Sequence, residues 1–364
     1  MTPLKGAAPA DAASAMCGAH AQVLTAAEWS IGLRLASSSR ADVQRALWQE
    51  HSLIKTVGPR GTVHLLPSKD LPWWNGALSA LPNEGDQYPD GMRLTPQQRD
   101  EVVEAIAYAL RDAELTVEEL GEAVLARTGS WAGDLVIPAF QTYWPRWRQA
   151  ISTAAYRGVL CFGPNRGRNV TYTNPRRWLP KLKPASEKSA LRWLVRSYLH
   201  AYGPATPQHF ARWLAAPRRW AEELFTRLKD DLQPVIMDDV QAWVSAGDAL
   251  FPDEKPRGVR LLPYFDAYAV GSYPREWLYP GRAAERAMAR GQAGNFPVLL
   301  IDGIVAGVWH QRRSGHKLQI TVEPLAKLSV AQKRELEAQV ARLGEFLDAQ
   351  PKLTIGKVRV GPHA

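Results

Sequence analysis

The sequence predicts an α+β protein in which three tandem winged helix-turn-helix units are followed by a small β-barrel-like domain. With 364 residues, the chain is long enough for several domains with separate cores. Capped helices followed by strand-like segments occur three times, and a proline- and lysine-rich stretch at 180–186 separates the last set. From about residue 258 onward, alternating apolar segments replace the short helices. We therefore expect four units, at 1–90, 91–183, 184–257 and 258–364.

The first unit is predicted mainly from helix start and stop signals. Gly18 weakens the end of an alanine-rich helix. Thr25 and Glu28 have the spacing of a capping box, and Ser39 is a typical N-cap. The expected elements are helices over 11–22, 25–35 and 40–49, an apolar segment at 52–57, a Gly/Pro turn at 58–61 and a strand-like segment at 62–66.

The second and third units repeat this pattern. Thr95 before Pro96 and Thr116 before Glu119 are capping signals, and Thr206 before Pro207 is a third. The second unit is expected to contain helices at 95–112 and 116–127, an apolar segment at 143–156, and a hairpin of strands 158–162 and 169–173 around the turn 163–168. The third is expected to contain helices at 190–202, 206–214 and 217–229 and strands at 235–237 and 242–244.

The last unit is predicted to be mainly β. Asp302-Gly303 between apolar runs is a strong hairpin signal. The expected elements are an apolar segment at 259–268, a hairpin over 298–309, strands at 318–322 and 354–360, and one long helix over 330–347.

Composition and charge narrow the class of protein. A formal net charge of +9 favours polyanionic partners such as nucleic acid, although an ordinary basic protein fits equally well. Cys17 and Cys161 lack the spacing of a zinc site and are expected to be reduced. No run is apolar enough to span a bilayer, and the N-terminus lacks a secretory core, so we expect a cytoplasmic bacterial protein. We expect no metal or cofactor, because no carboxylate pair, phosphate-binding loop, zinc-ligand set or nucleotide fingerprint is present. We also expect the protein to be a monomer.

His20 and Gln22 are the candidate catalytic pair. Two residues apart, they share one side of an extended segment, whereas on a helix they are separated by roughly 200°. A neutral imidazole can accept a proton from water, and a carboxamide can orient that water. The alternative is that His20 caps a helix or bonds a backbone carbonyl while Gln22 is solvated.

Several basic and polar residues are candidate DNA contacts. Arg60, at a Gly/Pro turn, is a candidate phosphate ligand, whereas Thr62 and His64 can face DNA or pack internally, with the internal role favoured. The basic tip between two C-terminal strands is the better candidate for a minor-groove probe, and a solvated charged turn is its alternative. The basic residues of the two hairpins are Arg166 and Arg168 in the second unit and Arg312, Arg313 and His316 in the last.

Several motifs resemble those of the bacterial winged-helix DNA glycosylases of the AlkZ and YcaQ type. They are Cys17-Gly18-Ala19-His20-Ala21-Gln22, Arg60-Gly61-Thr62-Val63-His64-Leu65, Tyr198-Leu199-His200-Ala201-Tyr202-Gly203-Pro204 and Leu261-Leu262-Pro263-Tyr264-Phe265-Asp266.

This resemblance implies three winged helices that cradle duplex DNA containing alkylated bases, followed by a β-barrel. It implies hydrolysis of the N-glycosidic bond of alkylated purines, including bulky or cross-linked N7-alkylguanine, in DNA repair or self-resistance. The family's Gln-apolar-Gln or Gln-apolar-Asp triplet corresponds here to His20-Ala21-Gln22, a His-x-Gln variant in which both side chains would place water at C1′. Tyr264 and Asp266 are then candidate residues of the active-site wall.

A non-catalytic winged-helix regulator or damage-binding protein is the alternative function. In such a protein, His20 and Gln22 would be buried and a recognition helix would be free to enter a major groove.

Overall fold

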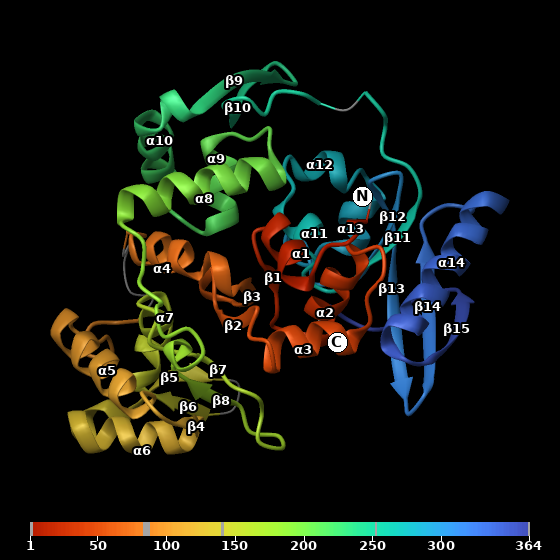
Figure 1. Ribbon diagram of the computed structural model, residues 1–364. Coiled ribbons are helices and arrows are strands. Elements are labelled where there is room, and N and C mark those ends of the chain that lie inside the picture. Colours follow the sequence, from red (N-terminus) through yellow and green to blue (C-terminus); the bar gives the residue numbers. More distant parts are fainter. Residues whose placement is uncertain (1–2, 83–87, 140–141, 252, 363–364) are drawn as a thin grey trace.

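The structure is a computed structural model that describes residues 3–82, 88–139, 142–251 and 253–362 (Figure 1). It is a mixed helix and sheet protein with a five-stranded sheet near the C-terminal end and smaller sheets before it. None of the described helices is both long and apolar enough to cross a membrane.

The first unit contains a small antiparallel sheet in which the last strand lies between the other two, in the order β1-β3-β2. Its elements are α1 (Pro9–Ala15), β1 (Ala19–His20), α2 (Leu24–Leu33), α3 (Arg40–Trp48), β2 (Leu53–Val57), η1 (Pro59–Gly61), β3 (Val63–Pro67), η2 (Ser68–Asp70) and α4 (Leu71–Ser79), where η denotes a short 3-10 helix.

The predicted end of the first helix and the predicted capping box of the second are wrong. The first helix ends at Ala15, because Cys17 and Gly18 have φ angles of 54° and 89° that no helix contains. A Cβ atom at Gly18 would lie only 2.6 Å from a methyl group of Leu66. The second helix begins at Leu24 without a side-chain cap, and Glu28 is instead buried and ion-paired with Arg40. The predicted cap at Ser39 is confirmed, since its hydroxyl accepts from the backbone N–H of Asp42.

The second unit repeats the topology, with the sheet order β4-β8-β7. The predicted caps at Thr95 and Thr116 are confirmed, and each forms a capping box. An additional hairpin, which the sequence reading missed, separates α6 from α7. The elements are α5 (Pro96–Ala109), β4 (Glu114–Thr116), α6 (Val117–Thr128), η3 (Ser130–Gly133), β5 (Leu135–Ala139), β6 (Thr142–Pro145), η4 (Arg146–Ala150), α7 (Ile151–Tyr156), β7 (Cys161–Phe162), β8 (Thr171–Thr173) and η5 (Pro175–Arg177).

The third unit has the same element order, with a single bridge in place of the first strand. Ala205 exchanges backbone hydrogen bonds of 3.0 and 2.9 Å with Trp243. The predicted cap of Thr206 on α9 is confirmed. The elements are α8 (Glu187–Tyr202), α9 (Pro207–Leu214), α10 (Arg218–Arg227), η6 (Lys229–Asp231), β9 (Leu232–Met237) and β10 (Val240–Ser245).

The C-terminal sheet has the order β11-β12-β13-β14-β15, and only the β14–β15 pair is parallel. Its edges are β11 and β15, so closure into a barrel is not seen among the described residues. The Asp302-Gly303 hairpin is confirmed, with positive φ at both residues. The last strand was predicted at 354–360, but β15 begins at Gln350 and ends at Ile355. The elements are β11 (Val259–Leu262), α11 (Ala267–Gly271), α12 (Arg275–Leu278), α13 (Arg282–Ala287), β12 (Val298–Ile301), β13 (Ile304–Ser314), β14 (Lys317–Pro324), α14 (Val330–Leu347) and β15 (Gln350–Ile355).

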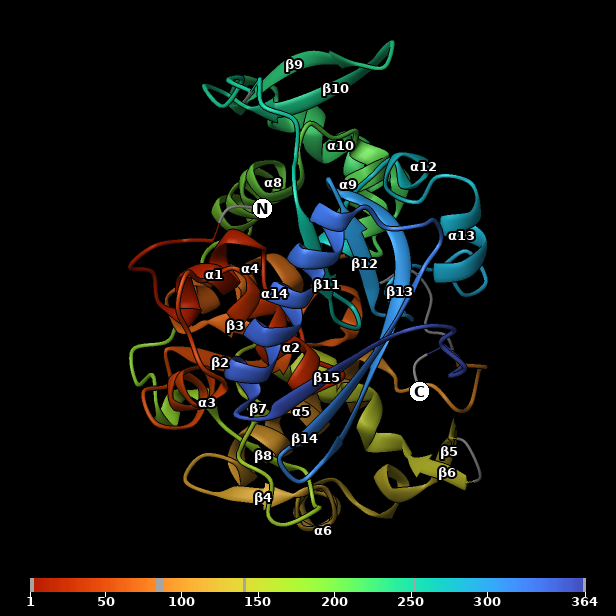
Figure 2. The ribbon, with the colours of Figure 1, turned by 90° about the vertical axis from the view of Figure 1, so that its right-hand side faces the viewer.

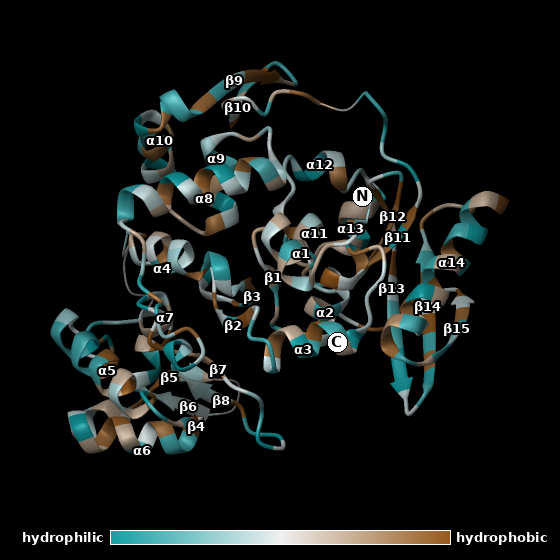
Figure 3. Ribbon diagram, in the orientation of Figure 1, coloured by the Kyte–Doolittle hydropathy of each residue, from teal (hydrophilic) through white to brown (hydrophobic). Residues whose placement is uncertain are grey.

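The largest core joins the first unit to the C-terminal sheet. Trp29 of α2 donates from Nε1 to the carbonyl of Leu261 at 2.9 Å and packs on Phe346 of α14 at a ring-centroid distance of 5.2 Å. Hydrophobic residues line β11 and β12 beside these helices (Figures 2 and 3). Burying a side chain of this size stabilises the fold by about 1.5–3 kcal/mol. The first unit and the C-terminal sheet are therefore one packed body.

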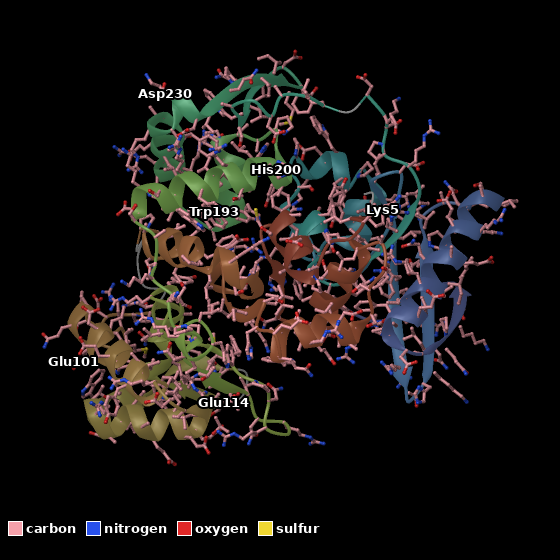
Figure 4. The ribbon with its side chains drawn as sticks, in the orientation of Figure 1. Lys5, Glu101, Glu114, Trp193, His200 and Asp230 are labelled. Carbon is pink, nitrogen blue, oxygen red and sulfur yellow. The ribbon has the colours of Figure 1, made fainter. Side chains whose placement is uncertain are left out.

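Two further cores organise the remaining units. One joins α4 to the helices of the third unit, where Trp193 of α8 (labelled in Figure 4) meets Trp74 edge-on at 5.2 Å. The other lies mostly within the second unit, around the buried Trp147. The third unit is thus fastened to the first through α4.

Candidate active site

His20 lies on β1 at the edge of the first sheet, directly opposite His64 of β3. The backbone N–H of Ala21 donates to the carbonyl of Val63 at 2.7 Å, and the Tyr202 hydroxyl donates to the carbonyl of Met16 at 2.7 Å. Gln22 lies in a bend before α2. The triplet is therefore not helical, as joint action of His20 and Gln22 on one molecule requires.

Two rings flank the His20 imidazole. The His64 ring lies edge-on to it, with centroids 5.1 Å apart and an interplanar angle of 70°. The Phe265 ring lies 4.5 Å away with an interplanar angle of 33°. His20 is half-buried and Gln22 is exposed, so the pair lies at the protein surface.

His64 is buried and neutral. Burial lowers its pKa well below the ordinary value, and the nearby Arg60 and His20 lower it further. Its Nδ1 lies 2.9 Å from the carbonyl of Thr62, which can only accept, so this nitrogen carries the proton. His64 is therefore a fixed, uncharged neighbour of His20, consistent with the internal role expected for it.

Asp266 is fixed in the wall behind Phe265. Its carboxylate accepts two hydrogen bonds of 2.9 Å from Arg34 and one of 2.6 Å from the Ser30 hydroxyl. It also accepts from the backbone N–H of Tyr268 at the start of α11. Burial alone would raise its pKa, but Arg34 and these hydrogen bonds hold the pKa below the ordinary value. Asp266 thus supports the wall without facing the site, while Tyr264 is half-buried, 6.3 Å from the Phe265 ring.

The sequence reading missed Phe265, the wall residue that contacts His20. Its neighbours in the motif were chosen for their polar groups, and an apolar ring between them carries no chemical signal. Arg34 was also missed, because its partner is 232 residues away in sequence.

The turn that contains Arg60 is enclosed by the other two units. Arg60 donates from Nη1 to the carbonyl of Trp213 at 2.6 Å, and Tyr156 donates to the carbonyl of Gly58 at 3.3 Å. The Thr62 hydroxyl closes the turn on Pro59 at 3.0 Å. Burial lowers the pKa of the Arg60 guanidinium. This turn therefore anchors the three units to one another, and Arg60 is one of the residues that line a cleft of about 450 Å³.

The remaining basic candidates are exposed on two hairpins away from His20. Arg166 is ion-paired with Glu119 at 2.9 Å and also donates to the carbonyl of Glu114, the residue labelled on β4 in Figure 4. Both hairpin tips lie on the lower side of the molecule in Figure 1, and the β13–β14 tip is hydrophilic in Figure 3. The other exposed members are Arg168 beside the first tip and Arg312, Arg313 and His316 at the second.

The site presents an imidazole and a carboxamide. Across the described ranges, no cluster of three histidine, cysteine, aspartate or glutamate side chains could hold a metal ion. In general, an imidazole can transfer a proton and a carboxamide can orient a small molecule.

Comparisons with known proteins agree on one family. A family model described as DNA glycosylase AlkZ-like matches residues 13–346. A relative described as an interstrand DNA cross-link repair glycosylase, from Streptomyces sahachiroi, is 32% identical over 318 residues, which cover 82% of this chain and 81% of the relative. The solved structure of the Streptomyces sahachiroi DNA glycosylase AlkZ matches with a TM-score of 0.78 and 28% identity, over 97% of this chain and 95% of that one.

Proposed function

Because this chain belongs to the AlkZ-like DNA glycosylase family, we propose that it excises alkylated purines, including bulky or cross-linked N7-alkylguanine, from duplex DNA. As a monofunctional DNA glycosylase it hydrolyses N-glycosidic bonds in DNA repair. The relative from Streptomyces sahachiroi is described as acting on interstrand cross-links, which supports a bulky substrate for this chain. We further propose that it acts as a monomer in DNA repair or self-resistance.

The placement of His20 and Gln22 is the observation that carries this proposal. His20 is half-buried on the edge strand β1, and Gln22 is exposed in the bend that follows it. A regulator would bury both. The helix before the hairpin of the second unit, α7, is only six residues long and packs against β2 and α4, so it is not free to enter a major groove.

The proposed chemistry needs little more than these two side chains. Alkylation at N7 makes guanine a cation, so the base leaves with the electrons of the bond to C1′ without prior protonation. Water then bonds to C1′ and gives its proton to the neutral His20, while Gln22 orients the water. The neutral His64 adds no positive charge beside a substrate that is itself cationic.

The repeated element order supports the inference that the first three units are winged helices, with boundaries at 1–90, 91–183 and 184–257. The C-terminal unit, 258–364, would place its basic hairpin against the same duplex. Arg312, Arg313 and His316 are exposed at its tip and Arg168 beside the tip of the second unit, where each could contact phosphates. For Arg60 and Arg166, which already have protein partners, we propose a secondary contact to DNA at most.

The test is incubation of the protein with duplexes that carry a small N7-alkylguanine, a bulky N7-alkylguanine or an interstrand cross-link. We expect release of free base and an alkali-labile abasic site from at least the bulky adduct. Tight binding without release from any of the three would contradict the proposal and favour a damage-binding protein.

A further inference from the structure

The Phe265 ring is held against His20 by an unusual backbone. Its φ angle is +53°, a left-handed conformation that is uncommon and strained for residues other than glycine. Such strain persists only where surrounding contacts impose it, and it is concentrated at functional sites.

The contacts that impose this conformation lie on both sides of Phe265. Its backbone N–H donates to the carbonyl of Gly294 at 2.9 Å. A Cβ atom on Gly294, whose own φ is +93°, would lie 2.7 Å from Val270 and 3.1 Å from the Phe265 ring. On the other side, Asp266 is buried and fixed by Ser30 of α2 and by Arg34 at the end of that helix. The ring therefore belongs to the C-terminal unit but is locked onto the first unit.

The second ring beside His20, that of His64, is also fixed. The edge of the His64 ring faces the imidazole, and the bond between His64 and the carbonyl of Thr62 sets the orientation of that ring. His20 thus contacts two rings whose own positions are determined by buried contacts.

We propose that Phe265 is a positioning residue for His20. It restricts the imidazole to one orientation and supplies an aromatic face that favours the imidazolium formed when His20 takes a proton from water. The inference rests on the proposed function for its kinetic consequence, but the contact itself can be tested independently of activity.

The kinetic test compares Phe265→Leu with Phe265→Tyr on duplexes that carry N7-alkylguanine. Loss of the aromatic face is expected to lower kcat roughly threefold to thirtyfold in Phe265→Leu, with KM and DNA affinity unchanged. Phe265→Tyr keeps the ring and should retain most of kcat. A Phe265→Leu variant with wild-type kcat, or one whose defect lies only in KM or in the fraction folded, would overturn the proposal.

A second measurement covers the case in which the wild type releases no base. In protein with 13C-labelled histidine, the ring current of Phe265 should displace the His20 imidazole proton resonances, assigned by their loss in His20→Asn. The displacement should disappear in Phe265→Leu and persist in Phe265→Tyr, with the His316 resonances as an unaffected control. Identical His20 resonances in wild type and Phe265→Leu would refute the contact even if no activity is found.

Discussion

At the scale of single residues, the site combines an exposed amide with an imidazole between two rings. Gln22 is free to meet solvent, whereas His20 is half-buried and its flanks are occupied by His64 and Phe265. This difference in exposure fits the proposed roles, proton transfer by His20 and orientation of water by Gln22.

Removing either side chain should separate these roles. We expect His20→Ala to lower kcat for base release by about 10²–10⁴-fold, the usual contribution of a general base. Gln22→Ala should lower kcat by about 10²-fold, because water remains available but unoriented. Both are measured in single-turnover release assays. His200→Ala, at an exposed histidine on α8, is the matched control and should release base at the wild-type rate. Wild-type rates in His20→Ala would remove the assignment.

His64 should make the free energy of unfolding depend on pH. Its pKa in the folded protein lies well below the ordinary value of about 6.5, so between the two values the unfolded chain binds a proton that the folded protein does not. Stability should therefore be constant above about pH 7 and fall as the pH is lowered below 6.5, by up to about 1.4 kcal/mol per pH unit from this one group.

Urea unfolding at pH 7.5, 6 and 5 measures this dependence. The other histidines whose pKa is lowered by burial, His51, His209 and His310, act in the same direction, so the informative quantity is the difference between wild type and His64→Gln. The free energy of unfolding of His64→Gln should fall less steeply at acid pH than that of the wild type. His316→Gln, at an exposed position, should follow the wild type. Equal slopes in wild type and His64→Gln would contradict the expectation.

At the scale of secondary structure elements, the Asp266–Arg34 pair connects α2 to the start of α11. Arg34 is 11% exposed and Asp266 not at all, so the pair is buried and bidentate. Asp266→Ala should lower the free energy of unfolding by about 3–5 kcal/mol, because it leaves the Arg34 charge without its partner.

Urea unfolding also tests this prediction, against the pair of Arg219 and Glu223 on α10. That pair is exposed and its residues are four apart, so Glu223→Ala should lower the free energy of unfolding by no more than about 0.5 kcal/mol. An equal loss of unfolding free energy in the two variants would show that the buried pair contributes no more to stability than a surface pair does.

The elements themselves show which parts of the fold a sequence can predict. Caps such as Ser39, Thr95 and Thr116 involve residues three apart, so their signals are local and were correct. The end of α1 depends on close packing of Gly18 against Leu66, which no local pattern shows. Glu28 has the spacing of a capping residue, but its ion pair with Arg40 prevails over that pattern. His20 and Gln22 could be predicted as site residues because their side chains carry recognisable chemistry. The contact of the Phe265 ring with His20 depends on long-range packing, so it could not be predicted.

At the scale of the whole molecule, the first unit is the centre to which the others are attached. It shares its core with the C-terminal sheet, and its η1 turn reaches the second and third units through Gly58 and Arg60. The β13–β14 hairpin extends the same packed body to an exposed basic tip. A duplex held by that tip would therefore be fixed relative to His20 through a rigid sheet.

Salt dependence tests whether the tip binds DNA. Log K falls linearly with log salt concentration, and each lost phosphate contact makes this slope shallower by about 0.9. The slope of the double variant Arg312→Ala/Arg313→Ala should therefore be shallower by up to about 2. Binding should weaken for undamaged and alkylated duplexes alike, because phosphate contacts carry no base information. The measurement is fluorescence anisotropy between about 50 and 200 mM salt. Arg334→Ala on α14 removes an exposed arginine away from the tip and should leave the slope unchanged. A double variant that keeps the wild-type slope but loses base release would mean that the hairpin acts on the lesion and not on the backbone.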